Sequence, residues 1–410
     1  MEHSKNRQTI TGILVSMILI FATFTILGEA VASHASPLVV DDDGEASVDS
    51  SSQADCDSDT TVNGSTTFDS IQAAIDYDVG GESHFIIVCP GEYSEIVIES
   101  DDGFDKIYGF PGAIIDEDDD GDNGVDAVEI NGVCSSTDRL ILDGFEIKNG
   151  EDGVDVEDSC RVFIQDNNIH DNTDDGVKFQ NTDDSWIHRN EVHLNGDEGI
   201  ELEDNSNNNF IGSNRVHDNV ASGIRIDEDD DPPTSINNVI AQNIVENNGD
   251  WGICLCGSEG ASNNKARGNR AIGNGADVTI GGSGNYKVEG TGNILTSNKA
   301  LSTIDGRDGF RIDGSGNTLK QNLAKENGGA GPAGEGFQVT ATGNTLTKNK
   351  AIENAGFGIQ DDTAGAGTAG TGNTYTLNTC DDNDAGGSFR AAVGPGDGFL
   401  CSPQNAPEPP

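Results

Sequence analysis

The chain has 410 residues, of which 72 are acidic and 22 are lysine or arginine, so its formal net charge is −50. This charge excludes a nucleic-acid or anionic-lipid surface, because both are bound through basic side chains. A hydrophobic content of 34% still permits a folded core, whereas 54 glycines argue against long helices. We therefore expect a folded, mostly non-helical protein that attracts cations.

The amino terminus has the three-part pattern of a secretory signal. Lys5 and Arg7 precede an apolar run from Ile13 to Leu27, and small residues suited to cleavage follow at positions 30–32. An uncleaved anchor is the alternative, although the run is shorter than the roughly 20 residues of a membrane span. We predict a signal peptide over residues 1–32, no span in the mature chain, and secretion to the exterior or cell surface, with the periplasm as the alternative.

Residues 33–66 are acidic and polar, which predicts a linker without structure of its own. After it, Ile71, Ala74 and Ile75 recur at helical spacing, and Ser70 is a suitable N-cap. Short strand-like runs separated by turns follow this segment. One short helix ahead of short strands predicts the capping end of a β-solenoid.

The main feature of the sequence is an internal repeat, Asn-x-Φ-x-x-Asn, in which Φ is apolar or small. It begins at Asn167, Asn190, Asn214, Asn243, Asn269, Asn322, Asn349 and Asn378, with partial copies at Gly144 and Asn298. A second marker, Gly-Φ-x-Φ, recurs at Gly153, Gly176, Gly199, Gly223, Gly252, Gly309 and Gly336. The first four steps are 23, 23, 24 and 29 residues in both columns, so the two markers are in register.

Each repeat has the alternating pattern of short strands, as in residues 199–203. Units this short cannot hold a strand–helix–strand crossover, and each can bury its apolar face only against its neighbours. The pattern predicts an all-β parallel solenoid of about ten coils over residues 67–395, followed by a Pro-rich tail over 396–410. Stacked asparagines are expected to bond to one another at the turns. A propeller is the alternative, but its blades need about 40 residues.

Residues 70–76 (SIQAAID) and 88–93 (VCPGEY) resemble the entry cap of pectin-lyase-like right-handed parallel β-helix proteins. The Asn/Gly units are similar to the repeats of that superfamily, including its NosD-like branch. This resemblance implies a right-handed helix, an extracellular or periplasmic location and frequent action on polysaccharides. It leaves activity open, because the scaffold carries lyases, hydrolases, epimerases and inert surface proteins. The Gly-His-Gly, Arg-x-Lys and Asp-Pro-His signatures of its enzymes are missing, which argues against catalysis.

One outward column of the repeat is the candidate catalytic site. It contains Asp155, Lys178, Glu201 and Arg225, and acidic residues such as Asp175 precede the repeat glycines. We take Asp175, Lys178, Glu201 and Arg225 as the catalytic candidates, since carboxyls beside a basic residue can transfer protons to and from a sugar. The alternative is charge pairing between coils on a solvated face.

Two metal sites are also predicted. Asp116, Asp118, Asp120 and Asp122 have the spacing of a Ca²⁺ loop, although Ala127 stands where the loop's bidentate Glu is expected. His170, His193 and His217 share one repeat position and would form an outward column suited to Cu²⁺ or Zn²⁺. The alternatives are an acidic turn and a histidine column without a metal.

Eight cysteines in an exported chain indicate disulfides. The spacing suggests the pairs Cys56–Cys89, Cys134–Cys160 and Cys380–Cys401. Cys254 and Cys256 remain. Two residues that are two positions apart on one strand lie too far apart to form a disulfide easily.

Two functional classes follow from these features. The first is a secreted or surface protein that interacts with polysaccharide, either without catalysis or as a lyase, hydrolase or epimerase. The second is a non-catalytic acidic matrix protein that binds Ca²⁺, or a NosD-like metal-binding protein of the periplasm. The expected partners are a glycan and divalent cations, and the chain is expected to be monomeric.

Overall fold

The computed structural model describes residues 38–41, 67–77, 85–99, 106–117, 124–135, 138–227, 235–257, 261–276, 283–304, 306–329, 334–390 and 400–403, with the short strands at 47–48, 54–55 and 394–395. All of them belong to the compact unit formed by residues 36–410. The predicted signal peptide lies outside them. None of the described helices is long and apolar enough to cross a membrane.

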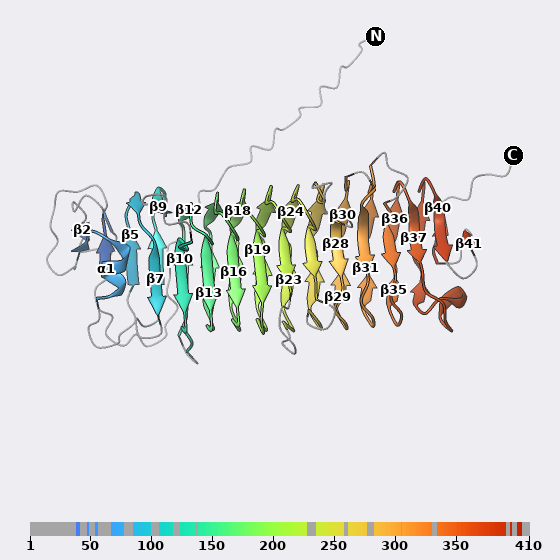
Figure 1. Ribbon diagram of the computed structural model, residues 1–410, viewed down its shortest axis with the longest axis horizontal. Coiled ribbons are helices and arrows are strands. Elements are labelled where there is room, and N and C mark those ends of the chain that lie inside the picture. Colours follow the sequence, from blue (N-terminus) through green and yellow to red (C-terminus); the bar gives the residue numbers. More distant parts are fainter. Residues whose placement is uncertain are drawn as a thin grey trace, which may run out of the picture. The chain divides into compact units, whose positions relative to one another are not determined.

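Three long sheets, which we call A, C and D, run along this unit and are almost entirely parallel (Figure 1). Sheet A contains β1 (Leu38–Val40), β4 (Thr67–Phe68), β5 (Phe85–Val88), β8 (Lys106–Gly109), β11 (Leu140–Asp143), β14 (Val162–Gln165), β17 (Trp186–His188), β20 (Phe210–Gly212), β23 (Val239–Ala241), β26 (Lys265–Arg267), β29 (Ile294–Thr296), β32 (Thr318–Lys320), β35 (Thr345–Thr347) and β38 (Thr374–Thr376). Sheet C contains β6 (Gly91–Tyr93), β9 (Ala113–Asp116), β12 (Glu146–Lys148), β15 (Asn168–His170), β18 (Glu191–His193), β21 (Arg215–His217), β24 (Ile244–Glu246), β27 (Arg270–Ile272), β30 (Lys299–Leu301), β33 (Leu323–Lys325), β36 (Lys350–Ile352), β39 (Thr379–Asp381) and β42 (Ser402–Pro403).

Sheet D contains β7 (Ile96–Glu99), β10 (Val128–Asn131), β13 (Val154–Glu157), β16 (Val177–Gln180), β19 (Ile200–Glu203), β22 (Ile224–Ile226), β25 (Ile253–Leu255), β28 (Gly284–Val288), β31 (Asp308–Ile312), β34 (Phe337–Val339), β37 (Phe357–Asp361), β40 (Gly386–Arg390) and β41 (Gly394–Pro395). Outside the three sheets lie the antiparallel pair β2 (Ser47–Val48) and β3 (Ala54–Asp55), the helix α1 (Ile71–Ile75) and the 3-10 turn η1 (Thr368–Gly370). Each coil adds one strand to each sheet, and twelve complete coils stack, from β5–β7 to β38–β40, close to the roughly ten predicted.

The core lies between the three sheets and is filled by alternate residues of every strand. Ile200 and Leu202 of β19 are fully buried, as their alternation predicts. Farther along, Phe310 stacks between Tyr286 and Phe337, with ring centroids 4.5 and 4.8 Å apart. Equivalent residues of successive coils therefore pack on one another, and each coil depends on its neighbours for burial.

Asparagine ladders hold the turns, as the repeat predicts. Asn190 Oδ1 accepts the backbone N–H of Asn167 at 2.9 Å, and its Nδ2 donates to the carbonyl of Ile164 at 2.9 Å. Asn214 and Asn243 repeat this pattern on the following coils. A further ladder, which the repeat motif also contains, runs through Asn172, Asn195, Asn219, Asn248 and Asn274. These amides satisfy backbone groups that the stacked coils bury.

The amino-terminal end differs from the prediction in one respect. Ser70 caps α1 by accepting the N–H of Ala73 at 3.2 Å, as expected. However, β1 lies inside the predicted linker 33–66 and pairs in parallel with β5 and β4. Its three apolar residues are buried, so they extend the core by one strand where composition alone indicated a polar linker.

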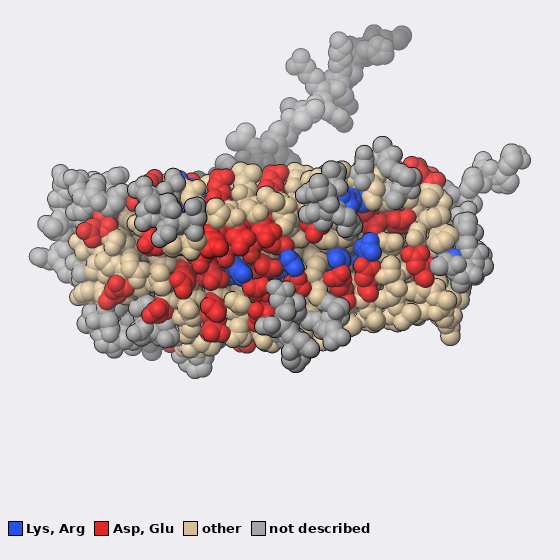
Figure 2. Space-filling model, in the orientation of Figure 1, with Lys and Arg blue, Asp and Glu red and all other residues tan. Residues whose placement is uncertain are grey.

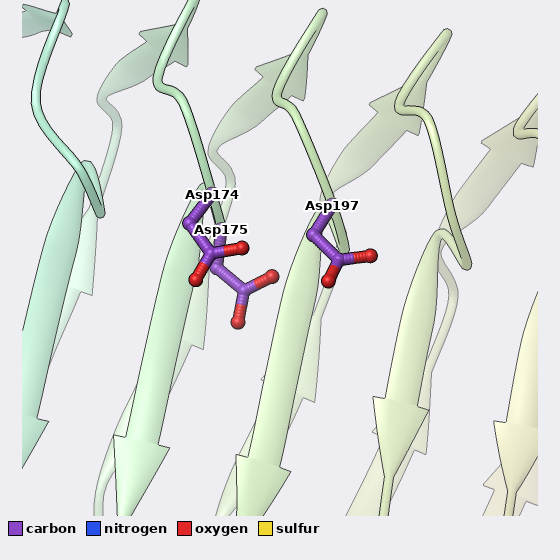
Figure 3. A group of neighbouring side chains, drawn as sticks. All are labelled: Asp174, Asp175 and Asp197. Carbon is purple, nitrogen blue, oxygen red and sulfur yellow. The ribbon is translucent and has the colours of Figure 1, made fainter.

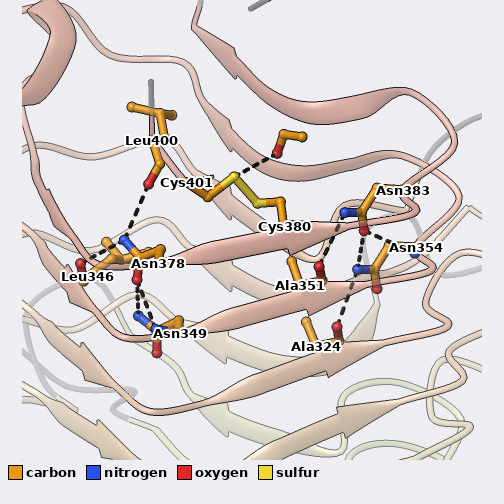
Figure 4. The surroundings of a disulfide bond; sticks show 11 residues. Ala324, Leu346, Asn349, Ala351, Asn354, Asn378, Cys380, Asn383, Leu400 and Cys401 are labelled. Carbon is orange, nitrogen blue, oxygen red and sulfur yellow. Dashed lines mark hydrogen bonds between the residues drawn. A yellow bond between two sulfur atoms is a disulfide. The ribbon is translucent and has the colours of Figure 1, made fainter. Parts of the chain in front are cut away.

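The carboxyl-terminal end is also more ordered than predicted. Cys380 and Cys401 form the expected disulfide, and the side-chain amide of Asn378 donates to the carbonyls of Leu346 and Leu400 at 2.9 and 3.4 Å (Figure 4). Strand β42 then pairs with β39. The β-helix therefore continues as far as residues 400–403, inside the segment 396–410 that we predicted as a tail, and the disulfide joins this part to β39.

Two of the other cysteine predictions can be compared with the structure. Cys134 and Cys160 are bonded as predicted, and Cys89 is bonded too, although its expected partner Cys56 lies outside the described residues. Cys254 and Cys256 are also bonded, with Cα atoms 5.2 Å apart, which corrects our expectation. Cys256 lies just beyond the end of β25, where the backbone is no longer extended, so the two Cα atoms lie closer than within a strand.

Candidate functional site

The candidate site lies on the outer face of sheet D. Parallel pairing of β13, β16, β19 and β22 aligns Asp155, Lys178, Glu201 and Arg225 on successive coils, as the repeat predicts. Figure 2 shows acidic side chains gathered on the middle of this face, with a few basic ones among them. We call the carboxyls of Asp126, Asp152, Asp155, Asp175, Glu198 and Glu201 the acidic strip.

Part of the acidic strip is a hydrogen-bonded ladder at the turn before sheet D. Asp126 Oδ1 accepts the N–H of Asp152 at 2.9 Å, and Asp152 Oδ1 accepts the N–H of Asp175 at 2.7 Å. Asp175 Oδ1 in turn accepts the N–H of Glu198 at 2.8 Å. Each carboxyl thus supports its neighbouring coil in the way that asparagine amides do in the other ladders.

Burial shifts the protonation of these carboxyls. Asp152 and Asp175 are 6% and 3% exposed. Burial raises the pKa of Asp152 to about 8, against the lowering effect of the Asp175 N–H. Burial, reinforced by the charge of Asp126, also raises the pKa of Asp155 to about 7. In the described part of the chain, Asp155 Oδ1 has no hydrogen-bond partner. Both side chains therefore change protonation state near neutral pH.

The centre of the strip is formed by Asp175, Glu198 and Glu201. Their carboxyl oxygens lie within 4.8 Å of one another, and burial, followed by the charge of Glu201, raises the pKa of both Asp175 and Glu198. Burial also raises the pKa of Glu201, although Arg225 opposes this shift. Because buried carboxylates this close repel one another, Asp175 favours its protonated form at neutral pH.

A second acidic group borders this centre. Oxygens of Asp174, Asp175 and Asp197 also lie within 4.8 Å of one another. Figure 3 shows Asp174 and Asp175 at the turn before β16 and Asp197 at the equivalent turn before β19. Asp197 is exposed, so the group reaches from the buried centre to the surface.

The two basic candidates are both paired with carboxylates. Lys178 Nζ lies 3.0 Å from Glu203, and Arg225 lies 3.1 Å from Glu198 and 3.5 Å from Glu201. Burial lowers the pKa of Lys178, but Glu203 and other carboxylates raise it overall. The pKa of Arg225 is raised in the same way, by Asp227 first. Neither side chain can therefore act as a base at neutral pH, and the charge-pairing alternative describes both of them.

The histidine column is aligned as predicted, on β15, β18 and β21. His193 stacks between His170 and His217, with ring centroids 4.9 Å apart on both sides. His193 Nε2 lies 3.1 Å from Asn168 Oδ1, and burial together with the neighbouring rings lowers the pKa of His193. Among the described residues, the groups whose ligand atoms lie within 4.8 Å include no histidine, so the Cu²⁺ or Zn²⁺ site stays a prediction.

The predicted Ca²⁺ loop falls mostly outside the described residues. Asp118, Asp120 and Asp122 lie outside the described residues. Asp116 closes β9 and contacts Lys148 Nζ at 2.5 Å and Asn149 Nδ2 at 2.7 Å. This candidate also stays a prediction.

Sequence reasoning did not place Asp126 in the acidic strip or Asp197 beside it. The signal was present in the turn before sheet D, where acidic residues recur at the steps at which other turns carry Asn. Glu203 is an outward residue in the alternating pattern of residues 199–203, yet it is only 9% exposed and is bound to Lys178. Outward residues are covered here because long side chains of adjacent coils lie against one another.

The comparisons agree with this architecture. Residues 126–292 match the family model of the right-handed beta helix region. The chain therefore has the fold of a right-handed parallel β-helix. Its fold is similar to that of the N-terminal fragment of bacteriophage Phi29 gene product 12, with a TM-score of 0.58, 12% identity, and coverage of 77% of this chain and 69% of that one.

Two other solved β-helix structures cover 82% of this chain and 94% of their own, each with a TM-score of 0.47. They are the A-module of the mannuronan C-5 epimerase AlgE4 of Azotobacter vinelandii, at 16% identity, and PfbA, a surface adhesin of Streptococcus pneumoniae, at 13%. No curated protein matches the sequence. These likenesses concern the fold, so function has to be argued from the residues of this β-helix protein.

Proposed function

We propose that this β-helix protein is exported and binds polysaccharide along the outer face of sheet D, with the acidic strip at the centre of the binding surface. Lys178, Arg225 and Asp197 form its accessible part, since the first two side chains are 25% and 33% exposed. Glu201 lies at its edge, and a carboxyl oxygen of the buried Asp175 lies within 4.8 Å of one of Glu201. Sugar hydroxyls would accept from the basic groups and donate to the carboxylates.

One observation carries this proposal: aspartate occupies ladder positions at which asparagine would make the same hydrogen bond. Asp126, Asp152 and Asp175 each use one oxygen to accept a backbone N–H, and an amide oxygen accepts the same bond in the other ladders. Replacing these carboxyls with amides would remove the cost of burying them. Side chains that lower stability without a structural need indicate a functional requirement.

The chemistry open to the strip is proton donation. A carboxyl that stays protonated at neutral pH can donate a hydrogen bond to a sugar oxygen, or a proton to a glycosidic oxygen during cleavage. Glu201 is the group placed for this role just below neutral pH, because its pKa is raised to about 6, and Asp175 beside it is a positioning residue. Base catalysis by Lys178 or Arg225 is not part of the proposal, because both are held in their charged forms.

The first test compares binding and turnover by the parent protein and by Glu201→Gln with Arg225→Ala. On a panel of neutral, acidic and sulfated polysaccharides, with and without Ca²⁺, we expect the double variant to bind its best ligand at least about tenfold more weakly, since hydrogen bonds to charged groups contribute roughly 1.5–3 kcal/mol each. Circular dichroism should be unchanged. Asp308→Asn is the matched control, because Asp308 makes the same ladder bond to Glu335 N–H at 2.8 Å on a distant coil. If the double variant binds as tightly as the parent protein does, the polysaccharide does not bind at the acidic strip of sheet D.

A divalent-cation site is the second candidate function, and the convergence of Asp174, Asp175 and Asp197 favours it. Ca²⁺ takes six to eight oxygen ligands. It could therefore take the place of the proton on Asp175 in this group of carboxyls. A ligand bound only by the native state raises its stability by mass action. We therefore expect the thermal midpoint to rise with NaCl, through screening, and to rise further with millimolar Ca²⁺ at fixed ionic strength.

Two double variants separate the possible calcium sites. Asp174→Asn with Asp197→Asn should remove the Ca²⁺-specific rise if the cation binds on sheet D. Asp118→Asn with Asp120→Asn should remove it if the cation binds the predicted loop. Should Mg²⁺ act as Ca²⁺ does, and both double variants respond as the parent does, the calcium hypothesis fails and only charge screening remains.

A further inference from the structure

Three aromatic side chains lie next to one another on the outside of sheet A. Pairing of β14, β17 and β20 places Phe163, Trp186 and Phe210 at equivalent positions on adjacent coils. Their ring centroids lie 5.1 and 5.5 Å apart. Trp186 is 48% exposed, whereas Trp251, the other tryptophan of the chain, is 4% exposed. Phe163 is 8% exposed, so Trp186 is the exposed member of this outward row. An exposed tryptophan on an outward face needs an explanation, because a polar residue would fill the position at no cost to the core.

The outer row is arranged differently from the aromatic ladder of the core. The core shows what a stabilising ladder looks like in this protein: Tyr286, Phe310 and Phe337 lie nearly parallel, at 12° and 5°, and are buried. In the outer row Trp186 is tilted by 58° from Phe163 and by 57° from Phe210. The tilt leaves much of the indole surface uncovered. An uncovered aromatic surface is suited to stacking on a ligand.

A hollow lies beside this row, at the corner where the chain passes from sheet D to sheet A. Its volume is about 660 Å³, and Phe163, Trp186, Arg139, Arg161, Asp184 and the Cys134–Cys160 disulfide line it. The Arg139 guanidinium lies 5.0 Å from the centre of the Phe163 ring. The chain has only 22 basic residues against 72 acidic ones, yet two arginines line this one hollow. A planar guanidinium pairs well with a carboxylate or sulfate, and two of them favour an anionic ligand.

We propose that this hollow binds an acidic sugar residue of a polysaccharide, either a uronate or a sulfated sugar. The apolar face of the sugar ring stacks on Trp186, and its anionic group lies between Arg139 and Arg161. Asp184 accepts a hydrogen bond from a ring hydroxyl. The row of rings extends the contact over the next coil, since successive rings lie about one sugar ring apart.

This site is separate from the acidic strip. It lies on sheet A, and the turn at residues 158–161 separates its strand β14 from β13 of sheet D. The proposal therefore does not rest on the function proposed for sheet D, and the two can fail independently. If both hold, the protein binds a polysaccharide on two adjacent faces, and the hollow selects chains that carry anionic groups.

The experiment measures binding of tetrasaccharides to the full chain by calorimetry and by intrinsic tryptophan fluorescence. The probes are a galacturonate oligomer, a sulfated oligosaccharide and a neutral cello-oligosaccharide. We expect the parent to bind at least one acidic probe, with a change in Trp186 emission, and to bind the neutral probe more weakly. Trp186→Ala and Arg139→Gln should each weaken acidic binding by about tenfold or more, the loss expected for a hydrogen bond to a charged group or a stacked ring. Trp186→Phe should retain part of it, because a ring remains.

Ile294→Ala is the matched control, since Ile294 is 41% exposed in the same outward column of sheet A, several coils away. The change in Trp186 emission reports on this hollow and so separates its ligand binding from binding on sheet D. Thermal melting of each variant establishes that it is folded. Failure of both acidic probes to bind, unchanged binding by folded Trp186→Ala, or equal affinity for the neutral probe would each overturn the proposal.

Discussion

Replacing Ile200 with Asp is expected to unfold the coils around β19. Ile200 is fully buried between the sheets, where no partner for a carboxylate exists among the neighbouring apolar side chains. Truncating a buried Ile costs roughly 2–5 kcal/mol, and burying an unpaired charge costs more. Because each coil is stabilised by its neighbours, the loss should spread along the stack and lower the cooperativity of unfolding. Circular dichroism during urea denaturation measures both effects.

Two variants at nearby positions provide the comparison. Ile200→Val keeps the shape and should cost only about 0.5–1.5 kcal/mol. Glu203→Gln removes the ion pair with Lys178 on the outward side and should cost about 1 kcal/mol or less. Were Ile200→Asp to unfold at the same urea concentration as Glu203→Gln, the assignment of inward and outward faces would be wrong.

The second large effect is a loss of stability as the pH rises from about 5 to 8. The folded protein holds protons on Asp152 and Asp155 up to pH values of about 8 and 7, whereas both carboxyls have an ordinary pKa of 3.8 in the unfolded chain. In this window the native state binds more protons than the unfolded state, so the free energy of unfolding falls as the pH rises. The stabilisation by these two protons is complete below about pH 4. It is lost as the pH rises through the folded-state pKa values of about 7 and 8. One pKa unit corresponds to about 1.4 kcal/mol, so the loss is on the order of several kcal/mol.

Amide variants of the ladder should flatten this dependence. Asp152→Asn and Asp175→Asn keep the oxygen that accepts the neighbouring N–H but remove the titrating group. We expect both to be more stable than the parent at pH 8 and similar to it at pH 5. Asp362→Asn, at an exposed position in the described part of the chain, should follow the parent curve. A parent protein whose stability rises between pH 5 and 8 would show that these carboxyls are ionised in the native state.

Much of the fold follows from the sequence because stacking repeats one local pattern. The Asn and Gly columns mark turns and strand starts, and the alternation in residues such as Ile200 and Leu202 marks the inward face. The ends were harder to predict, because they have no repeat. β1 rests on three apolar residues inside an acidic segment. β42 follows Cys401 of the predicted Cys380–Cys401 disulfide, but the composition of the tail gave no sign of a strand there.

The candidate site was predictable in position but not in its electrostatics. The register of the repeat in the sequence was enough to align four residues on successive coils: Asp155, Lys178, Glu201 and Arg225. Burial decides which of these groups are charged, and it depends on side chains of adjacent coils lying across one another. For this reason Lys178 and Arg225, which the sequence suggests as reactive groups, are instead bound in ion pairs, while the carboxyls beneath them hold protons.

The aromatic hollow was not predicted from the sequence. Phe163, Trp186 and Phe210 stand 23 and 24 residues apart, in step with the repeat, so their alignment could have been read from the steps of the Asn column. Arg139 belongs to the previous coil, and its position over Phe163 depends on the path of the turn. That path is a property of the folded stack.

The central claim is that the acidic strip holds protons at neutral pH. The most direct measurement is an NMR titration of the side-chain carboxyl carbons in the full chain, with Asp152→Asn and Asp155→Asn used to assign the signals. The account predicts that Asp152 titrates near pH 8 and Asp155 near pH 7, and that Asp175 stays protonated through neutral pH. If all three titrate below about pH 5, as carboxyls in contact with water do, sheet D holds an ordinary acidic surface and the claim is wrong.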